Sequence, residues 1–80
     1  MSDKQPVPIC KCVEDALERY FAQLHGEAPS GLYDLILAEV ERPLLRSVMH
    51  HAGSNQSRAA RYLGINRNTL RTKLKRYGIE

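Results

Sequence analysis

The C-terminal segment Gly53–Glu80 reads GSNQSRAARYLGINRNTLRTKLKRYGIE and predicts two short amphipathic helices joined by a tight turn. Ser54 and Asn55 are suitable N-cap residues, able to accept hydrogen bonds from the first N–H groups of a helix that begins near Gln56. Gly64 follows the last apolar residue of this helix, the usual place for a residue of positive φ that ends a helix. The first helix therefore has both a start signal and a stop signal.

The second helix of the pair also has a start signal and a stop signal. Asn66 is its expected cap, Leu70 and Leu74 recur at the spacing of one apolar helix face, and Gly78 is expected to end it. The turn between the two helices is about three to four residues long, which is typical of the helix-turn-helix unit of DNA-binding proteins.

Basic residues concentrate in this same segment. From Ser54 to the end there are seven Lys/Arg and one acid, a local charge of +6, whereas residues 1–53 carry five bases and eight acids, a charge of −3. The formal net charge of +3 therefore hides a strongly polarised chain. A basic helical unit on an acidic remainder points to the phosphate backbone of nucleic acid.

The outward positions of the second helix predict how it reads DNA. The first residues of a recognition helix reach base edges in the major groove, and the guanidinium of Arg67 matches O6 and N7 of guanine. We therefore expect base readout from Arg67 and Asn66, although Asn66 is also suited to a phosphate. Cations and hydroxyls are expected to bind phosphates, namely Ser57, Thr69, Arg71, Lys73, Lys75 and Arg76. A basic helix that serves only solubility is the weaker alternative, because caps, turn glycine and cations agree.

Two longer helices are expected upstream, over residues 9–24 and 32–52. Pro43 lies inside the second of these, so we expect a kink there, with a split into two helices as the alternative. Both helices carry apolar rows too large for the rest of one chain to cover, which is typical of an interface. We expect a homodimer built from these rows: Val13, Leu17, Tyr20, Phe21 and Leu24 in the first helix, and Tyr33, Leu37, Val40, Leu44 and Val48 in the second.

The domain organisation follows from these elements. We expect a flexible arm over residues 1–8, dimerisation helices over 9–52 and the DNA-binding unit over 53–80, all within one compact domain. No run of about 18 apolar residues is present, so no transmembrane helix is expected.

Three stretches of the chain resemble the Fis family of bacterial nucleoid-associated proteins: ALERYFAQLHG at 16–26, LYDLILAEVERPLL at 32–45 and NQSRAARYLGINRNTLRTKLKRYGI at 55–79. The resemblance implies an all-α, intertwined homodimer of four-helix chains, acting in the cytoplasm on the nucleoid. It implies DNA bending around an A/T-rich centre that the protein does not touch, with Arg67 of each subunit on a flanking guanine. It also adds Asn55 to the residues expected to contact DNA.

The sequence departs from the Fis pattern at three places. Thr72 stands where a lysine is familiar, so we expect one weaker phosphate contact. The chain before residue 9 is too short for the β-hairpin arm with which Fis stimulates site-specific invertases, so such a partner is not expected. The loop at 52–54 lacks the arginine with which Fis contacts RNA polymerase, so the polymerase is a weaker partner prediction than DNA.

Other chemistry has little support in the sequence. Cys10 and Cys12 lack a second ligand pair, so we expect free thiols and no metal site. No nucleophile is paired with a histidine, so we expect no catalytic residue, no cofactor and no enzymatic activity. Two alternatives to the Fis-like function stay open: the DNA-binding end of an enhancer-binding transcriptional activator with more direct base readout, and a helical adaptor for acidic protein surfaces.

Overall fold

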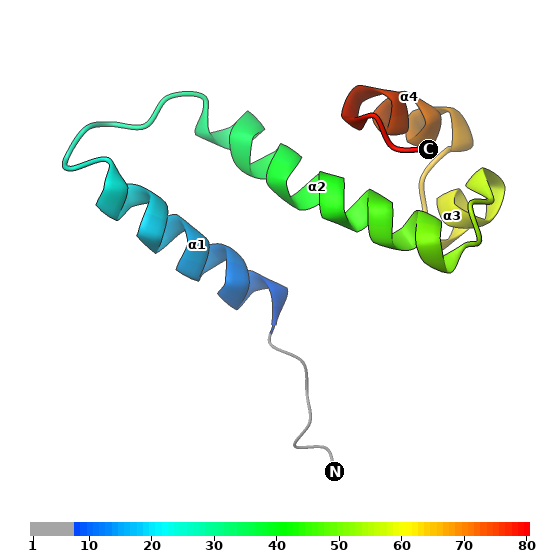
Figure 1. Cartoon of the computed structure of the whole chain (residues 1–80), viewed down its shortest axis with the longest axis horizontal. Coiled ribbons are helices and arrows are strands. Elements are labelled where there is room, and N and C mark those ends of the chain that lie inside the picture. The colour runs from blue at the N-terminus through cyan, green and yellow to red at the C-terminus, as the bar shows by residue number, and fades with distance from the viewer. Residues whose placement is uncertain (1–7) are drawn as a thin grey trace, which may run out of the picture. The chain divides into compact units, whose positions relative to one another are not determined.

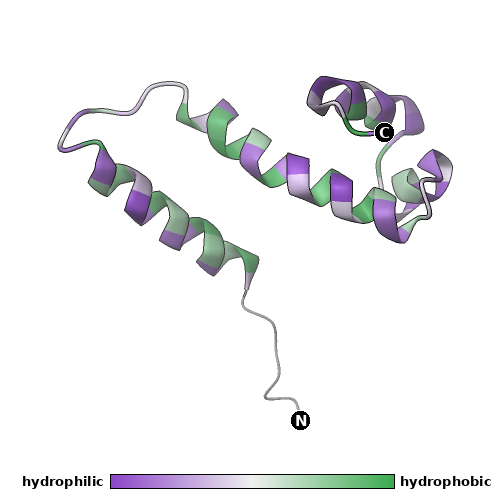
Figure 2. Ribbon diagram, in the orientation of Figure 1, coloured by the Kyte–Doolittle hydropathy of each residue, from purple (hydrophilic) through white to green (hydrophobic). Residues whose placement is uncertain are grey.

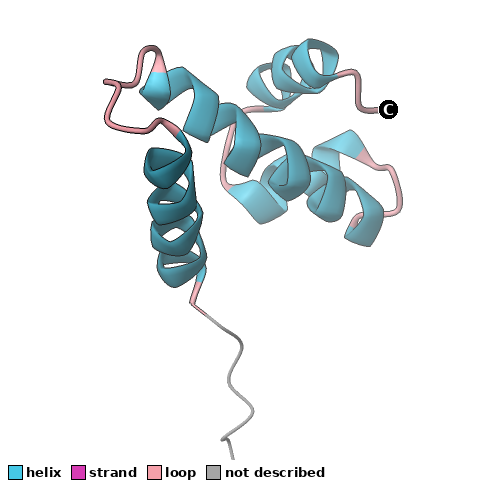
Figure 3. Ribbon diagram, turned by 60° about the vertical axis from the view of Figure 1, so that its left-hand side comes forward, coloured by secondary structure: helices cyan, strands magenta, loops and turns pink. Residues whose placement is uncertain are grey.

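The structure, a computed structural model, describes residues 8–80, so the predicted arm at residues 1–8 lies outside the described residues except for Pro8. Four helices follow in order (Figure 1): α1 (Ile9–Gln23), α2 (Leu32–His51), α3 (Gln56–Leu63) and α4 (Arg67–Tyr77). Residues 8–80 contain no strand (Figure 3), which confirms the all-α prediction. The described backbone divides into two compact units, one that ends at residue 32 and one that spans residues 33–80.

The first unit contains α1, which has no buried residue. The rings of Tyr20 and Phe21 meet edge to face with centroids 6.1 Å apart, a favourable arrangement for two aromatic rings. Phe21 is nevertheless 46% exposed. The chain leaves the helix where His25 and Gly26 adopt positive φ angles, at the place where the sequence predicts an end.

The helix α2 is continuous through Pro43. Of the two expectations for this segment, the single helix is confirmed and the split into two helices is wrong. Pro43 is exposed, so its ring lies beside solvent. Its missing N–H removes one hydrogen bond within the helix. Apolar and polar residues alternate along the helix (Figure 2), as expected of an element that serves a core on one side only.

A small apolar core joins the end of α2 to α3 and α4. Its buried members are Leu45, Met49, Ala52, Ala59, Ala60, Leu70 and Leu74. The two alanines of α3 leave room for close approach, and the two leucines of α4 fill that space from one face. Burying this face is what holds the two short helices, since helices of 8 and 11 residues are marginal on their own.

Asparagines cap both short helices at their N-termini. The side-chain oxygen of Asn55 accepts from the backbone N–H of Arg58 at 2.9 Å, and that of Asn66 accepts from the N–H of Asn68 at 2.7 Å. Ser54 is not a cap: its φ is +63°, and its N–H donates to the Met49 carbonyl at 2.9 Å. Ser54 therefore closes the end of α2, and Asn55 alone begins α3.

Glycines close both short helices, as the sequence predicts. Gly64 has φ +75° and Gly78 has φ +64°. The N–H of Ile65 reaches back to the Ala60 carbonyl at 3.1 Å, and the N–H of Ile79 reaches the Leu74 carbonyl at 2.9 Å. These bonds satisfy carbonyls that the helix ends would leave free.

Candidate nucleic-acid interface

The two residues predicted to read bases lie at the start of α4. Asn66 and Arg67 are both exposed, and a guanidinium N–H of Arg67 donates to the hydroxyl of Ser57 on α3 at 3.4 Å. This long hydrogen bond brings a predicted base reader beside a predicted phosphate ligand. The predicted DNA contacts of α3 and α4 therefore meet on one surface.

The capping asparagines have donors left for a ligand. In Asn55 and Asn66 the side-chain oxygen is occupied by a backbone N–H, which leaves the amide NH₂ of each residue as a donor. A donor at a helix N-terminus suits an anion, because the helix dipole favours negative charge there.

The remaining polar side chains of α4 fall into two groups. Thr69, Arg71, Lys75 and Arg76 are exposed, and α4 appears largely hydrophilic in Figure 2. Thr72 instead turns back on its own helix, since its hydroxyl donates to the Asn68 carbonyl at 3.0 Å. The hydroxyl of Thr72, the residue that departs from the Fis pattern, thus donates its hydrogen bond within α4.

Lys73 differs from the other predicted phosphate ligands because it is paired within the protein. Its ammonium lies 2.8 Å from Oε2 of Glu41 on α2, and only 26% of its side chain is exposed. Oε1 of the same carboxylate accepts from the Tyr77 hydroxyl at 2.6 Å. Both oxygens of Glu41 are therefore used by residues of α4.

Glu41 corrects the sequence-based view of the acids of α2. From the sequence alone, these acids are assigned to solvated helix faces, with Glu39 or Glu41 paired with Arg42 or Arg46. The structure places Glu39 near Arg42 at 4.0 Å, whereas the side chain of Glu41 is only 16% exposed and pairs with Lys73. The hydrogen bond from Lys73, followed by that from Tyr77, lowers the pKa of Glu41 below its ordinary value of 4.5. Donating to Glu41 raises the pKa of the Tyr77 hydroxyl above 10.0.

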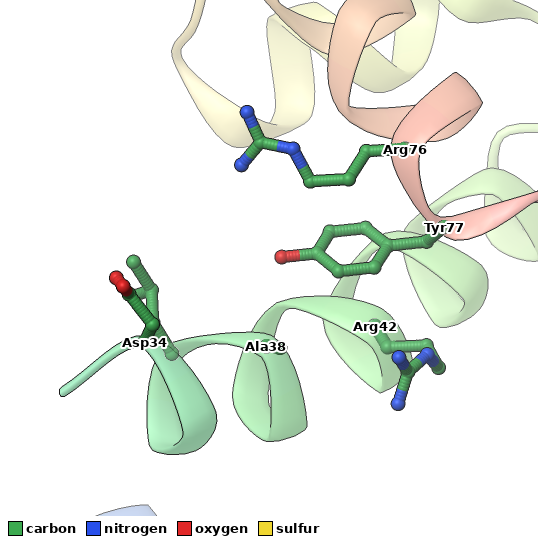
Figure 4. A pocket seen from close by; sticks show the side chains of 6 residues that line it. Asp34, Ala38, Arg42, Arg76 and Tyr77 are labelled. Carbon is green, nitrogen blue, oxygen red and sulfur yellow. The ribbon is translucent and has the colours of Figure 1, made fainter. Parts of the chain in front are cut away.

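The ring of Tyr77 is held between α4 and α2. The guanidinium carbon of Arg42 lies 5.4 Å from the centre of this ring, within the range of a cation–π contact. A hollow opens beside the ring (Figure 4) and is lined by Asp34, Leu37, Ala38, Arg42, Arg76 and Tyr77. In Figure 4 Tyr77 projects from α4 over α2, with Arg42 below it.

The predicted dimer row on α2 is mostly exposed. Tyr33 is 77% exposed and Leu44 is 45% exposed, with Leu37 and Val40 close to two-fifths. Val48 differs, because it packs against the core beneath α3 and α4. The predicted residues Val13, Leu17 and Tyr20 of α1 are partly exposed, as is Leu24, which follows the last residue of this helix.

Residues 8–80 contain no group of three His, Cys, Asp or Glu side chains placed to hold a metal ion. Cys10 and Cys12 are free and exposed. His50 and His51 lie in the last turn of α2, where cations suit the helix dipole, with ring centroids 5.4 Å apart. No helix of the described chain is long and apolar enough to span a membrane.

The capped helix pair, its turn glycine and the exposed cations of its second helix define a helix-turn-helix protein. Residues 36–77 match the family "Bacterial regulatory protein, Fis family", and residues 1–29 match the family "DNA-binding protein Fis N-terminal domain". The chain belongs to the Fis family.

Two relatives illustrate the match. The chain is 56% identical over 72 residues to a "Putative Fis-like DNA-binding protein" of Ralstonia nicotianae, covering 90% of this chain and 94% of that protein. It is 57% identical over 72 residues to "DNA-binding protein Fis" of Yersinia enterocolitica, covering 90% of this chain and 74% of that protein.

Proposed function

We propose that this chain binds and bends DNA at the nucleoid, regulates transcription and organises the chromosome. The observation that carries the proposal is the surface on which Arg67 at the start of α4 meets Ser57 of α3, beside the exposed cations of α4. The relatives are named as DNA-binding proteins, which supports the same function here. The proposal includes no enzymatic activity.

In this proposal α4 enters the major groove with its N-terminus toward the bases. Arg67 reads a guanine and Asn66 donates to a base edge or a phosphate. Six predicted phosphate ligands are exposed and suited to that role: Asn55, Ser57, Thr69, Arg71, Lys75 and Arg76. Lys73 is the exception, because its ammonium is paired with Glu41.

The proposed active form is an intertwined homodimer. The exposed row Tyr33, Leu37, Val40 and Leu44 of α2 needs a cover, and the apolar row of α1 offers one in a second copy. Residues 9–52 thus serve dimerisation and residues 53–80 serve DNA contact. As the resemblance to Fis implies, we place the two recognition helices of the dimer closer together than one turn of straight duplex. The DNA must then bend, which makes an A/T-rich, deformable centre favourable.

The alternative, the DNA-binding end of an enhancer-binding activator, explains less of the chain. It accounts for α3 and α4 but gives no role to residues 1–29, which match the N-terminal domain of Fis. It also predicts direct base readout with little dependence on the centre of the site.

Fluorescence anisotropy tests the proposal with two duplexes that share flanking G·C pairs and differ in an A/T-rich or a G/C-rich centre. We expect tight binding that prefers the A/T centre and that falls by about 10³–10⁵ between 50 and 200 mM salt, as for a protein with about 6–10 phosphate contacts. Equal affinity for both duplexes would favour the activator-like alternative. Absence of binding to both would refute DNA binding.

A further inference from the structure

A single carboxylate of α2 holds two successive turns of α4. Lys73 and Tyr77 are four residues apart, so their side chains lie one above the other on the same helix face. Oε2 of Glu41 accepts from Lys73 at 2.8 Å and Oε1 accepts from Tyr77 at 2.6 Å. Together with the buried Leu70 and Leu74, two bonds to two turns restrain the rotation of α4 about its own axis more tightly than one bond would.

That rotation decides which α4 side chains face outward. At 3.6 residues per turn, Arg71 and Lys75 each lie about 160° from Lys73 around the helix. When Lys73 and Tyr77 face α2, Arg71 and Lys75 must therefore face away from it, and both are exposed. The contacts of Glu41 on one side of α4 thus set the direction of cations on the other.

The same cluster pairs the positive charge of Lys73 with the carboxylate of Glu41. Three contacts join α4 to α2 at this cluster. The Lys73 ammonium pairs with Glu41, the Tyr77 hydroxyl bonds the same carboxylate, and the guanidinium carbon of Arg42 lies 5.4 Å from the centre of the Tyr77 ring. The hydrogen bonds that hold Glu41 ionised make it a lasting partner for a cation. Lys75, by contrast, is exposed two residues further along the helix.

We infer that Glu41 and Tyr77 are positioning residues for DNA recognition: they fix the rotation of α4 and keep Lys73 paired within the protein instead of with a phosphate. This inference rests on the proposed DNA binding and deepens it. It assigns Lys73, which the sequence alone predicts as a phosphate ligand, to the support of the recognition helix. If the cluster only stabilised the fold, its variants would lower the melting temperature but keep the salt slope and the preference for the A/T centre.

The test compares the full-length wild type with Lys73→Gln and its matched control Lys75→Gln. For each protein the affinity for the A/T-centred duplex is measured against salt concentration, after circular dichroism has shown a folded chain. Each lost phosphate contact lowers the slope of log affinity against log salt by about 0.9, or about twice that in a dimer. We expect Lys75→Gln to show this loss, and Lys73→Gln to weaken binding with the slope of the wild type.

Two further variants test the positioning role. Glu41→Gln removes both the partner of Lys73 and the restraint on the rotation of α4. Lys73 can then turn toward a phosphate, so the slope should steepen by about 0.9 per subunit while the preference for the A/T centre falls. Tyr77→Phe keeps the ring and removes only the hydroxyl, so it should lower that preference at an unchanged slope. This milder variant keeps the test decisive if Glu41→Gln does not fold.

The outcomes separate the inference from the proposed function. If Lys73→Gln loses as much slope as Lys75→Gln, Lys73 contacts a phosphate and the inference is overturned. It is also overturned if Glu41→Gln and Tyr77→Phe bind as the wild type does. If the wild type binds neither duplex, the proposed function fails and the inference fails with it. If the wild type binds both duplexes equally, the preference for the A/T centre cannot be compared. The salt slopes of Lys73→Gln, Lys75→Gln and Glu41→Gln then decide whether the inference holds.

Discussion

The two halves of α2 place similar residues in opposite surroundings. In its C-terminal half Leu45 and Met49 are 2% and 4% exposed, because α3 and α4 cover them. In its N-terminal half Tyr33 and Leu37 are 77% and 38% exposed. Leu44 and Leu45 are neighbours in the chain, yet they point about 100° apart on the helix and have different environments.

This difference shows that the apolar character of α2 serves two purposes. One face completes a core within the C-terminal unit, and the other is available to another surface. Glu41 lies on this helix as well and binds α4, so α2 both supports α4 and offers a row for association. A change on one face should therefore alter stability, and a change on the other should alter assembly.

The largest effect is expected from Leu45→Ala. Deleting a buried leucine side chain removes its apolar contacts and leaves a cavity, which costs about 2–5 kcal/mol of unfolding free energy. Urea unfolding followed by circular dichroism measures this loss. We expect the change in unfolding free energy to be the same at low and at high protein concentration, because the contact lies within one chain.

If the loss for Leu45→Ala depended strongly on protein concentration, Leu45 would belong to the association surface and not to the core of one chain. The neighbouring variant Leu44→Ala is the matched control. Its effect should disappear at concentrations too low for association.

The next effect is expected from Leu44→Glu, which acts on the exposed row of α2. Burying a leucine in an interface is worth about 1.5–3 kcal/mol, and an unpaired carboxylate there adds a further cost. In a two-fold dimer both changes occur twice, so association should weaken by about 100-fold or more. Sedimentation velocity over a concentration series measures the shift from dimer to monomer.

Tyr62→Glu on α3 provides a control with the same change of charge. Tyr62 is 61% exposed and lies outside the rows on α1 and α2. This variant should sediment as the wild type does. If Leu44→Glu did so as well, the exposed row of α2 would have no role in association.

Most of the helix boundaries could be predicted from the sequence, because their signals are local. Asn66, Gly64 and Gly78 act on backbone groups within a few residues, and all three take the predicted roles. The error at Ser54 is local as well: two adjacent residues were both suited to be a cap, and the geometry that ends α2 left only Asn55 available.

The Glu41 cluster could not be predicted in the same way. Glu41 is 32 residues from Lys73 and 36 residues from Tyr77, so no helix spacing relates them. Their meeting depends on how α4 packs against α2. From the sequence Lys73 is one cation among several, and only this packing separates it from Lys75.

A smaller effect is expected from Gly64→Ala, which tests how α3 and α4 close over the buried half of α2. Gly64 has φ +75°, and no atom lies within 4 Å of the position that a Cβ would occupy. The cost is therefore conformational and about 1–2 kcal/mol, the penalty of a left-handed alanine. Thermal unfolding should show this loss while the association measured by sedimentation is preserved, and Gly64→Asn should cost less.

The smallest effect is expected in acid, where Glu41, the carboxylate that links α2 to α4, titrates. The pKa of Glu41 is lowered on folding, so the unfolded chain binds more protons below its ordinary value of 4.5. The stabilisation is therefore present above pH 4.5 and is lost as the pH falls through the lower pKa of the folded state. Urea midpoints measured between about pH 3 and pH 6 should fall less steeply for Glu41→Gln than for the wild type.

The control is Glu39→Gln, at a residue whose side chain is 65% exposed. This variant should keep the wild-type steepness, because it leaves Lys73 and Tyr77 bound to Glu41. Equal steepness in all three proteins would mean that the link between α2 and α4 contributes nothing to folding.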